Sequence, residues 1–367
     1  MGLNQPSQLR RDPISGQPVF VAPSRFARPG GGLSAYQQAN GSKAKKAACA
    51  EPVEEGTCPF CPGEEHQTPP AILESLALSK EHNGSRGWQV RVVPNKYPAV
   101  RPSQGEFLEG HSETLGGPYF LQEGEGEHEV VIETPRHVRS VTECSQEELA
   151  QVFWVYTQRL QELRKQQRWQ QSVVFKNVGR MAGASLAHSH SQILSLPEMP
   201  PQLQMEQIGA EKYYKNYGKC GFCEVLAFEE QAEQRWISAT DRFVAYCPFA
   251  SRYPGEICIL PREHASHFEF LPQEQTGELA ELVKAVIRGI ERKFGEVAYN
   301  WVIHSGPFDT WEQKHYHWHI EIIPRLAQTI AGFELGGGMT LNALAPETAA
   351  ALLREQMSCQ VSNVNSS

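Results

Sequence analysis

The sequence lacks any long hydrophobic run, although 40% of its 367 residues are hydrophobic. No uninterrupted apolar segment reaches about 18 residues, the length that a membrane-spanning helix needs. The opening residues, MGLNQPSQLRRDPISG, hold no apolar stretch typical of a secretory signal peptide. Pro6 also stands where a myristoylation signal has Ser or Thr. We therefore expect a cytoplasmic protein that does not engage a membrane.

An excess of positive charge is also missing. The chain has 34 Lys and Arg residues against 42 Asp and Glu residues, and its formal net charge is -8. Nucleic-acid binding depends on clustered Lys and Arg against phosphates, so we expect no nucleic-acid partner.

The number of cysteines is odd. The chain has 9 cysteines and no export signal, which argues against a disulfide framework. Metal ligation or buried thiols become the default interpretation.

Two sets of elements follow one another in similar order. Alternation of apolar residues predicts strands at 88–93, 128–133 and 172–178, and again at 257–260, 300–304 and 317–323. Three- and four-residue periodicity predicts amphipathic helices at 145–168 and 272–294. The order suggests an internal duplication. A Gly-, Ala-, Lys- and Glu-rich segment at 30–56 is typical of a loop, and its role stays open.

A short motif, AHSHSQ, places three nitrogen-bearing side chains at alternate positions. In a strand, residues two apart share a face, so His188, His190 and Gln192 would point the same way. Ser189 and Ser191 would point to the opposite face. Such a polar face is not typical of a core, although solvated surface histidines remain an alternative.

Cys-x-x-Cys pairs occur in both halves, each followed by two histidines. His188 follows His137 by 51 residues (188 minus 137), and His317 follows His264 by 53 (317 minus 264). Thiolates and neutral imidazoles are preferred Zn2+ ligands, and four closed ligands make a structural site. The sequence therefore predicts two zinc sites, with the ligand sets Cys58, Cys61, His137, His188 and Cys220, Cys223, His264, His317.

Alternatives remain for both sets. A lone Cys-x-x-Cys can be a redox pair, and the second pair can be buried thiols without a metal. His304, His315 and His319 are rival ligands, and His304, His317 and His319 with a carboxylate could hold a different divalent ion.

If His188 binds zinc, His190 remains available as a nucleophile. A neutral imidazole can attack phosphorus, and a backbone carbonyl that accepts from the other ring nitrogen would set its tautomer. Gln192 could donate its amide N–H to a phosphoryl oxygen. The Gly-rich turn with Gly183 and Ser185 could approach phosphates closely. Candidates for local positive charge are Arg25, Arg28, Lys176 and Arg180.

The second motif, HWHIE, has Glu321 where the first has Gln192. A carboxylate facing a phosphate would repel it. We expect the second copy to have lost the transfer reaction and kept a structural role.

These motifs resemble those of the galactose-1-phosphate uridylyltransferase family in the histidine-triad superfamily, and particularly its branch with the plant-type ADP-glucose phosphorylases. The resemblance runs from LRRDPISGQPVFVAPSRFARP at 9–29 through CPFC, VRVVPNKYPAV, EVVIETPRHV, FKNVGRMAGASLAHSHSQI, YPGEICILPREHASHF and HYHWHIEIIPRL to AGFELGGGMTLNALAPE at 331–347. It covers nearly the whole chain.

The resemblance implies an α+β fold of two fused histidine-triad-like halves, each an antiparallel sheet backed by helices. Residues 1–200 would form the half with the catalytic motif and the first zinc site, and 201–350 the half with the second. Residues 351–367 would be a disordered tail. The family's active sites usually form across a homodimer.

The resemblance also assigns roles by position. His190 matches the histidine that becomes nucleotidylated, and Gln192 the amide that holds the phosphoryl group. Both zinc sets match structural ligand positions. Nucleotide-contacting positions correspond to Arg28, Asn95, Asn177, Gly183 and Ser185, with Arg25 beside them, and hexose-contacting positions to Phe333 and Glu334.

The implied reaction is ping-pong nucleotidyl transfer, first with UDP-glucose and galactose 1-phosphate. Ser189 between the histidines and Asn95-Lys96-Tyr97 depart from the uridylyltransferase pattern, so the base and the acceptor stay open. ADP-glucose with phosphate is the close alternative. Water as the acceptor would make the protein a hydrolase, and a non-catalytic zinc-stabilised nucleotide-binding module is the alternative from another class.

Overall fold

The computed structural model describes residues 6–27, 58–76, 87–103, 112–114, 120–326 and 330–358. The predicted loop at 30–56 and the predicted contact residue Arg28 lie outside these ranges. No helix in the described part of the chain is long and apolar enough to cross a membrane.

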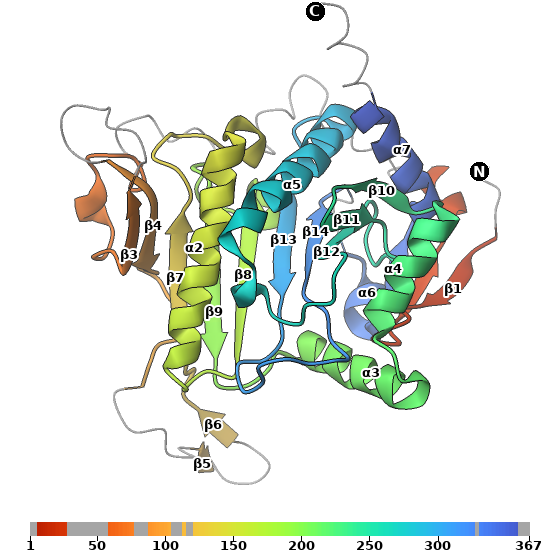
Figure 1. Ribbon diagram of the computed structural model, residues 1–367, viewed down its shortest axis with the longest axis horizontal. Helices are drawn as coiled ribbons and strands as arrows, with labels where there is room; N and C mark the ends of the chain where they lie inside the picture. The colour runs from red at the N-terminus through yellow and green to blue at the C-terminus, as the bar shows by residue number, and fades with distance from the viewer. Residues whose placement is uncertain are drawn as a thin grey trace, which may run out of the picture.

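A ten-stranded antiparallel sheet runs through the molecule, and helices α2 and α5 pack together in front of it (Figure 1). Five strands come from each half of the chain. The first half gives β3 (Leu73–Leu76), β4 (Trp88–Pro94), β7 (Glu127–Ile132), β8 (Gln171–Val178) and β9 (His190–Leu196). The second half gives β10 (Trp236–Ala239), β11 (Phe243–Tyr246), β12 (Ile257–Pro261), β13 (Tyr299–His304) and β14 (His319–Pro324).

The strand order β10-β11-β12-β14-β13-β8-β9-β7-β4-β3 is symmetric about its centre. β13 and β8 pair there, so β14 in the second half corresponds to β9 in the first. The predicted α+β class and the duplicated order of elements are confirmed. The two expected sheets form one, because the edge of each half-sheet satisfies its backbone groups by pairing with the other.

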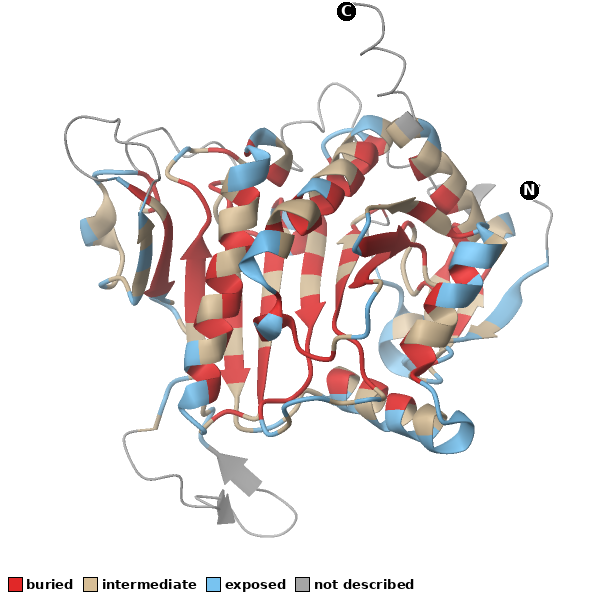
Figure 2. Cartoon of the chain, in the orientation of Figure 1, coloured by how far each residue is buried: buried red, intermediate tan, exposed pale blue. Residues whose placement is uncertain are grey.

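The two long helices form where periodicity predicted them. α2 (Gln146–Lys165) begins after Ser145, whose side chain accepts from the Glu148 N–H while the Glu148 side chain accepts from the Ser145 N–H. α5 (Gln273–Phe294) begins after Pro272. Their apolar stripes and the central strands are buried (Figure 2), and together they form the main core.

The N-terminal hairpin does not belong to the half in which the sequence placed it. β1 (Gln8–Arg11) and β2 (Pro18–Val21) form a separate sheet, in which β2 runs parallel to β15 (Thr340–Asn342). An ion pair of 2.9 Å also joins Arg10 of β1 to Glu347, which follows β15 in the chain. The boundary predicted at residue 200 therefore does not describe residues 8–21, because their strand partner is distant in sequence.

The remaining helices are α3 (Pro201–Tyr217), α4 (Gly221–Ala232), α6 (Gly332–Gly337) and α7 (Pro346–Ser358). Residues 351–358, which the sequence placed in a disordered tail, belong to α7, and Leu353 is buried. Gly289 of α5 faces α7, where a Cβ would meet Met357 and Leu353 at ordinary contact distances of 3.6 and 3.9 Å. Residues 359–367 lie outside the described residues.

Candidate functional site

His190 opens strand β9 with its ring held in one tautomer. Its Nδ1–H donates to the carbonyl of His188 at 2.7 Å, so a neutral ring presents its lone pair at Nε2. Burial lowers the pKa of His190, and the ring is 8% exposed. The structure thus contains the backbone carbonyl acceptor that a histidine nucleophile requires.

The first predicted ligand set comes together beside this ring. Cys58, Cys61, His137 and His188 bring their ligand atoms within 4.8 Å of one another. Cys61 Sγ lies 3.3 Å from His137 Nδ1, and both sulfurs lie 3.6 Å from His188 Nδ1. Phe60, between the two cysteines, contacts the His188 and His190 rings at centroid distances of 6.0 and 5.3 Å.

This group fits a tetrahedral zinc ion. Zn–S and Zn–N bonds of about 2.3 and 2.0 Å place sulfur and nitrogen ligands about 3.5 Å apart. His188 Nε2–H donates to the carbonyl of Thr134 at 2.8 Å, which leaves Nδ1 free to face the thiols. Burial lowers the pKa of His188 to about 4, so the ring is a neutral donor.

In the second half, the donors separate into two groups that share no residue. Cys220, Cys223, His264 and His317 form one group, with Cys223 Sγ 3.4 Å from His264 Nδ1 and 3.7 Å from His317 Nδ1. Glu206, His304, His319 and Glu321 form the other. His317 therefore lies with the cysteines, and the sequence alternative that combined it with His304 and His319 does not match this arrangement.

Lys176, a sequence candidate for binding phosphate, lies on β8, and its fully buried side chain reaches the face of the sheet opposite the His190 ring. It pairs with Glu133 and donates to Ser189 Oγ at 2.9 Å and to the carbonyl of His190 at 3.1 Å. Tyr156 OH donates to the same Glu133 carboxylate at 2.9 Å. Lys176 thus belongs to a buried network behind the nucleophile strand and is not available to a phosphate from this position.

Burial raises the pKa of Glu133, but the Lys176 ammonium and the hydroxyl donors of Ser189 and Tyr156 outweigh it and hold this pKa below its usual value. The Glu133 carboxylate is therefore ionised. A buried charge is tolerated only when paired and hydrogen-bonded in this way.

The glycine-rich turn follows β8. Gly179 and Gly183 have φ values of 81° and 89°, which favour glycine, and Gly183 and Ser185 are exposed. The Gly183 N–H donates to the Arg180 carbonyl at 2.9 Å, so the turn itself uses the donor that the sequence offered to phosphate. Asn300 Nδ2 donates at 2.8 Å to Asn177 Oδ1 and to the Ala182 carbonyl, which ties the turn to the sheet.

The other predicted contact residues divide into two regions. Asn95 lies near Gln192, with its Nδ2 3.4 Å from Gln192 Oε1. Arg25, Phe333 and Glu334 belong to the region of β2, β15 and α6, where Phe333 packs 6.4 Å from Phe20. Figure 1 places α6 and β9 in different parts of the molecule. One chain therefore does not bring its predicted hexose contacts to its own His190.

Both carboxylate oxygens of Glu334 accept from backbone N–H groups, of Ala331 at 2.9 Å and of Leu341 at 3.1 Å. Phe333 is 53% exposed. Within the chain, Glu334 therefore holds α6 against β15. The Phe333 side chain is more exposed and is the one that could contact another molecule.

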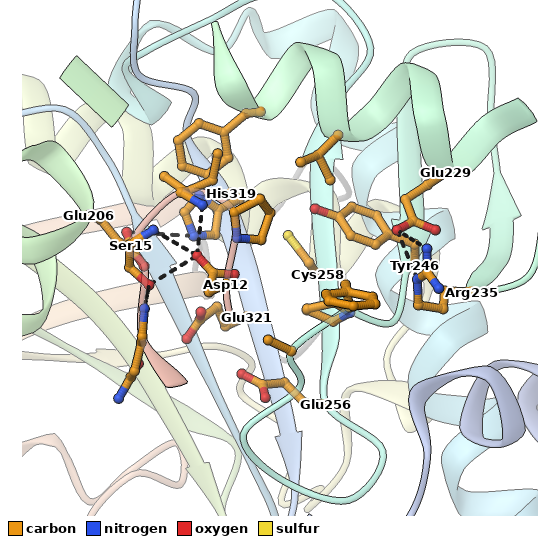
Figure 3. Close-up of a pocket in the computed structure, with 18 of the residues that line it drawn as sticks. Asp12, Ser15, Glu206, Glu229, Arg235, Tyr246, Glu256, Cys258, His319 and Glu321 are labelled. Carbon is orange, nitrogen blue, oxygen red and sulfur yellow. Dashed lines mark hydrogen bonds and ion pairs between the residues drawn. The ribbon is translucent and has the colours of Figure 1, made fainter. Parts of the chain in front are cut away.

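A cavity of about 550 Å³ lies in the second half, above β11, β12 and β14 (Figure 3). Glu206, His319 and Glu321 lie at one end, and Glu229 with Arg235 at the other. Burial raises the pKa of Glu321, but Arg252 and the nearby histidines outweigh it and lower this pKa to about 2. The carboxylate that replaces the amide of the first motif is thus ionised.

Three residues near the site were not predicted from the sequence motifs: His128, Glu133 and Tyr156. His128 lies 2.8 Å from Gln192 Oε1, and Glu133 and Tyr156 support the strand from behind. The sequence VVIE, in which a charged residue ends an apolar strand, could have indicated that Glu133 is buried.

Comparison with known proteins gives consistent matches. The model of the galactose-1-phosphate uridyl transferase N-terminal domain matches residues 3–200, and a domain of unknown function (DUF4921) matches residues 125–365. An ADP-glucose phosphorylase of Arabidopsis thaliana is 31% identical over 360 residues, covering 96% of this chain and 93% of the relative. A galactose-1-phosphate uridylyltransferase of Thermotoga maritima is 28% identical over 307 residues, covering 81% and 89%.

A solved structure shows the same similarity. The crystal structure of an ADP-glucose phosphorylase from Arabidopsis thaliana with bound ADP-glucose superimposes with a TM-score of 0.76 at 31% identity, covering 95% of this chain and 99% of that one.

Proposed function

The chain belongs to the galactose-1-phosphate uridylyltransferase family, and from that premise we propose that His190 transfers a nucleoside monophosphate from a nucleotide sugar. The observation that carries this proposal is the fixed tautomer of His190, whose Nε2 lone pair lies on the ring edge opposite the bond to the His188 carbonyl.

The reaction consists of two displacements. His190 Nε2 attacks the phosphorus attached to the nucleoside, a P–N bond forms, and the P–O bond to the leaving hexose 1-phosphate breaks. The Gln192 amide donates to a phosphoryl oxygen while charge develops. A phosphate oxygen of the acceptor then attacks the same phosphorus, and the P–N bond breaks, which restores the neutral imidazole.

Two donor and acceptor pairs suit this chemistry. UDP-glucose with galactose 1-phosphate would make the protein a hexose-1-phosphate uridylyltransferase. ADP-glucose with phosphate would make it an ADP-glucose phosphorylase, which the 31% identical Arabidopsis relative favours. Both pairs use the same nucleophile and differ in the base and in the second acceptor.

Zn2+ is the proposed occupant of both Cys2His2 groups. The sulfur–nitrogen distances of 3.3 to 3.7 Å suit tetrahedral coordination. In the first group, the ion would join the Cys58–Cys61 knuckle to His188, two residues before the nucleophile. Its role is structural, because four protein ligands leave no open position for substrate.

A homodimer is the proposed assembly. Helix α6, which carries Phe333 and Glu334, lies apart from β9, which carries His190 (Figure 1). These two residues, together with Arg25, would therefore complete the site of a second copy. The second-half cavity, with ionised Glu321 beside Glu206, does not suit a phosphate. We assign no transfer reaction to it.

The test uses UDP-glucose and ADP-glucose, each labelled in the phosphate attached to the nucleoside. After quenching, the account predicts acid-labile, base-stable label on the wild-type protein and none on His190→Gly, whose zinc content stays unchanged. Galactose 1-phosphate or phosphate then discharges the label, which identifies the acceptor. Absence of label from either donor would favour the non-catalytic binding module, and discharge by water alone would indicate a hydrolase.

A further inference from the structure

Two backbone N–H groups determine which atoms His128 and Asn95 present to Gln192. The N–H of Ala99 donates to His128 Nδ1 at 3.1 Å. A backbone N–H can only donate, so Nδ1 carries the lone pair and a neutral ring carries its proton on Nε2. Burial lowers the pKa of His128, which keeps the ring neutral.

The same reasoning fixes the Asn95 amide. The N–H of Tyr97 donates to Asn95 Oδ1 at 2.9 Å, so the other end of this amide is its NH2 group. The Asn95 backbone N–H donates to the His128 carbonyl at 2.8 Å, which holds the two residues together.

Both donors converge on one oxygen. His128 Nε2 lies 2.8 Å from Gln192 Oε1, and Asn95 Nδ2 lies 3.4 Å from it. The two nitrogens lie 3.2 Å apart, as two donors to one acceptor, because the Ala99 and Tyr97 N–H groups leave both of them as donors. If the Gln192 amide were turned over, its NH2 group would face two other donors. Only the orientation with the carbonyl oxygen toward His128 satisfies these contacts, and it turns the Gln192 NH2 group away from both donors.

We propose that His128 and Asn95 are positioning residues that lock the Gln192 amide with its NH2 group directed to the transferred phosphoryl group. The inference depends on the proposed function in one respect, the presence of a transferred phosphoryl group. The orientation of the Gln192 amide does not depend on it. Without the lock, the amide would also populate the opposite orientation, and its oxygen would then repel the phosphoryl oxygens. His128 acts only through Gln192 and does not itself touch the substrate.

The kinetic test is a double-mutant cycle of His128→Leu and Gln192→Ala, read as the single-turnover rate of protein nucleotidylation at saturating donor. His128→Leu should slow the reaction about tenfold or more, with a smaller change in KM. The double variant should be no slower than Gln192→Ala alone, because the lock has nothing left to orient. His128→Gln, which keeps an N–H donor, should recover part of the rate.

His66→Leu is the matched control, because His66 is exposed and lies outside this chain of hydrogen bonds. Its rate should equal that of wild type. The proposal is overturned if His128→Leu keeps the full rate, or if it slows Gln192→Ala by the same factor as it slows wild type.

A second measurement decides the inference without any turnover. In the histidine-labelled protein, 15N shifts should show His128 protonated at Nε2 and unprotonated at Nδ1, with the signal assigned by its loss in His128→Leu. A proton on Nδ1 overturns the lock whatever the activity. If neither donor labels the wild type, the proposed function fails, and the 15N result still decides the orientation of Gln192.

Discussion

Ser189 illustrates how one residue connects the nucleophile strand to the interior. Its N–H donates to the Val138 carbonyl at 2.7 Å, and its hydroxyl group donates to Glu133 at 2.6 Å while accepting from Lys176. A proline at this position would offer neither donor. The Ser189 hydroxyl group thus satisfies hydrogen bonds of both members of the buried Lys176–Glu133 pair.

Lys176→Met should destabilise the protein by about 3 to 5 kcal/mol, because it leaves the Glu133 carboxylate buried without its partner. Denaturant unfolding measures this change. Lys165→Met is the control, since Lys165 forms an exposed pair with Glu162 and should change stability by no more than about 0.5 kcal/mol. Equal effects of the two changes would contradict the role assigned to Lys176.

The sequence predicted the placement of polar residues on the His190 face better than that of polar residues on the opposite face. Alternation placed His190 and Gln192 together, because the side-chain period of a strand is fixed. It could not show that Lys176 points inward, since a charged residue in a strand is usually solvated and its buried partner, Glu133, is 43 residues away.

Among the elements, the Cys58–Cys61 knuckle is one whose geometry would depend on the proposed zinc ion. Its own hydrogen bond is short-range, from the Cys61 N–H to the Cys58 carbonyl at 3.0 Å. The contacts to His137 and His188 cross 76 and 127 residues of sequence from Cys61. Zinc would therefore hold the knuckle against β9.

Cys58→Ser should remove one equivalent of zinc, measured by atomic absorption, and lower the thermal midpoint by about 5 °C or more. Cys144→Ser is the control, because Cys144 is a buried thiol outside both Cys2His2 groups. It should leave the zinc content unchanged. Full zinc content in Cys58→Ser would contradict the assignment of this ligand.

Periodic elements were predictable and long-range pairings were not. The 145–168 and 272–294 predictions match α2 and α5 within a few residues, because caps and apolar periodicity are local signals. The pairing of β2 with β15 joins residues 19 and 340, and no local pattern indicates such a partner.

For the whole molecule, the main feature is that two similar halves share one sheet but differ in their histidine motifs. The first motif has the neutral amide of Gln192 where the second has the carboxylate of Glu321. β9 bears His190 and Gln192, and β14 bears His319 and Glu321 at equivalent places. The sequence predicted this duplication from the repeated order of strands and helices. It did not predict that the cavity of about 550 Å³ would lie over the second motif, because α3, α4 and the N-terminal hairpin enclose it.

Mixing two inactive variants should test the shared site of the proposed homodimer. His190→Gly removes the nucleophile, and Phe333→Ala removes an exposed ring of the second region. After subunit exchange, half of the dimers are mixed and each has one intact site, so about a quarter of wild-type activity should return. No recovery, with exchange verified by mass spectrometry, would place both residues in a site within one chain.

The most direct test of the account is to locate the nucleotide on the protein. After brief incubation with UDP-glucose or ADP-glucose and an alkaline quench, peptide fragmentation should show one nucleoside monophosphate on His190. An adduct on His188, on His319 or on a residue outside β9, with His190 unmodified, would contradict it.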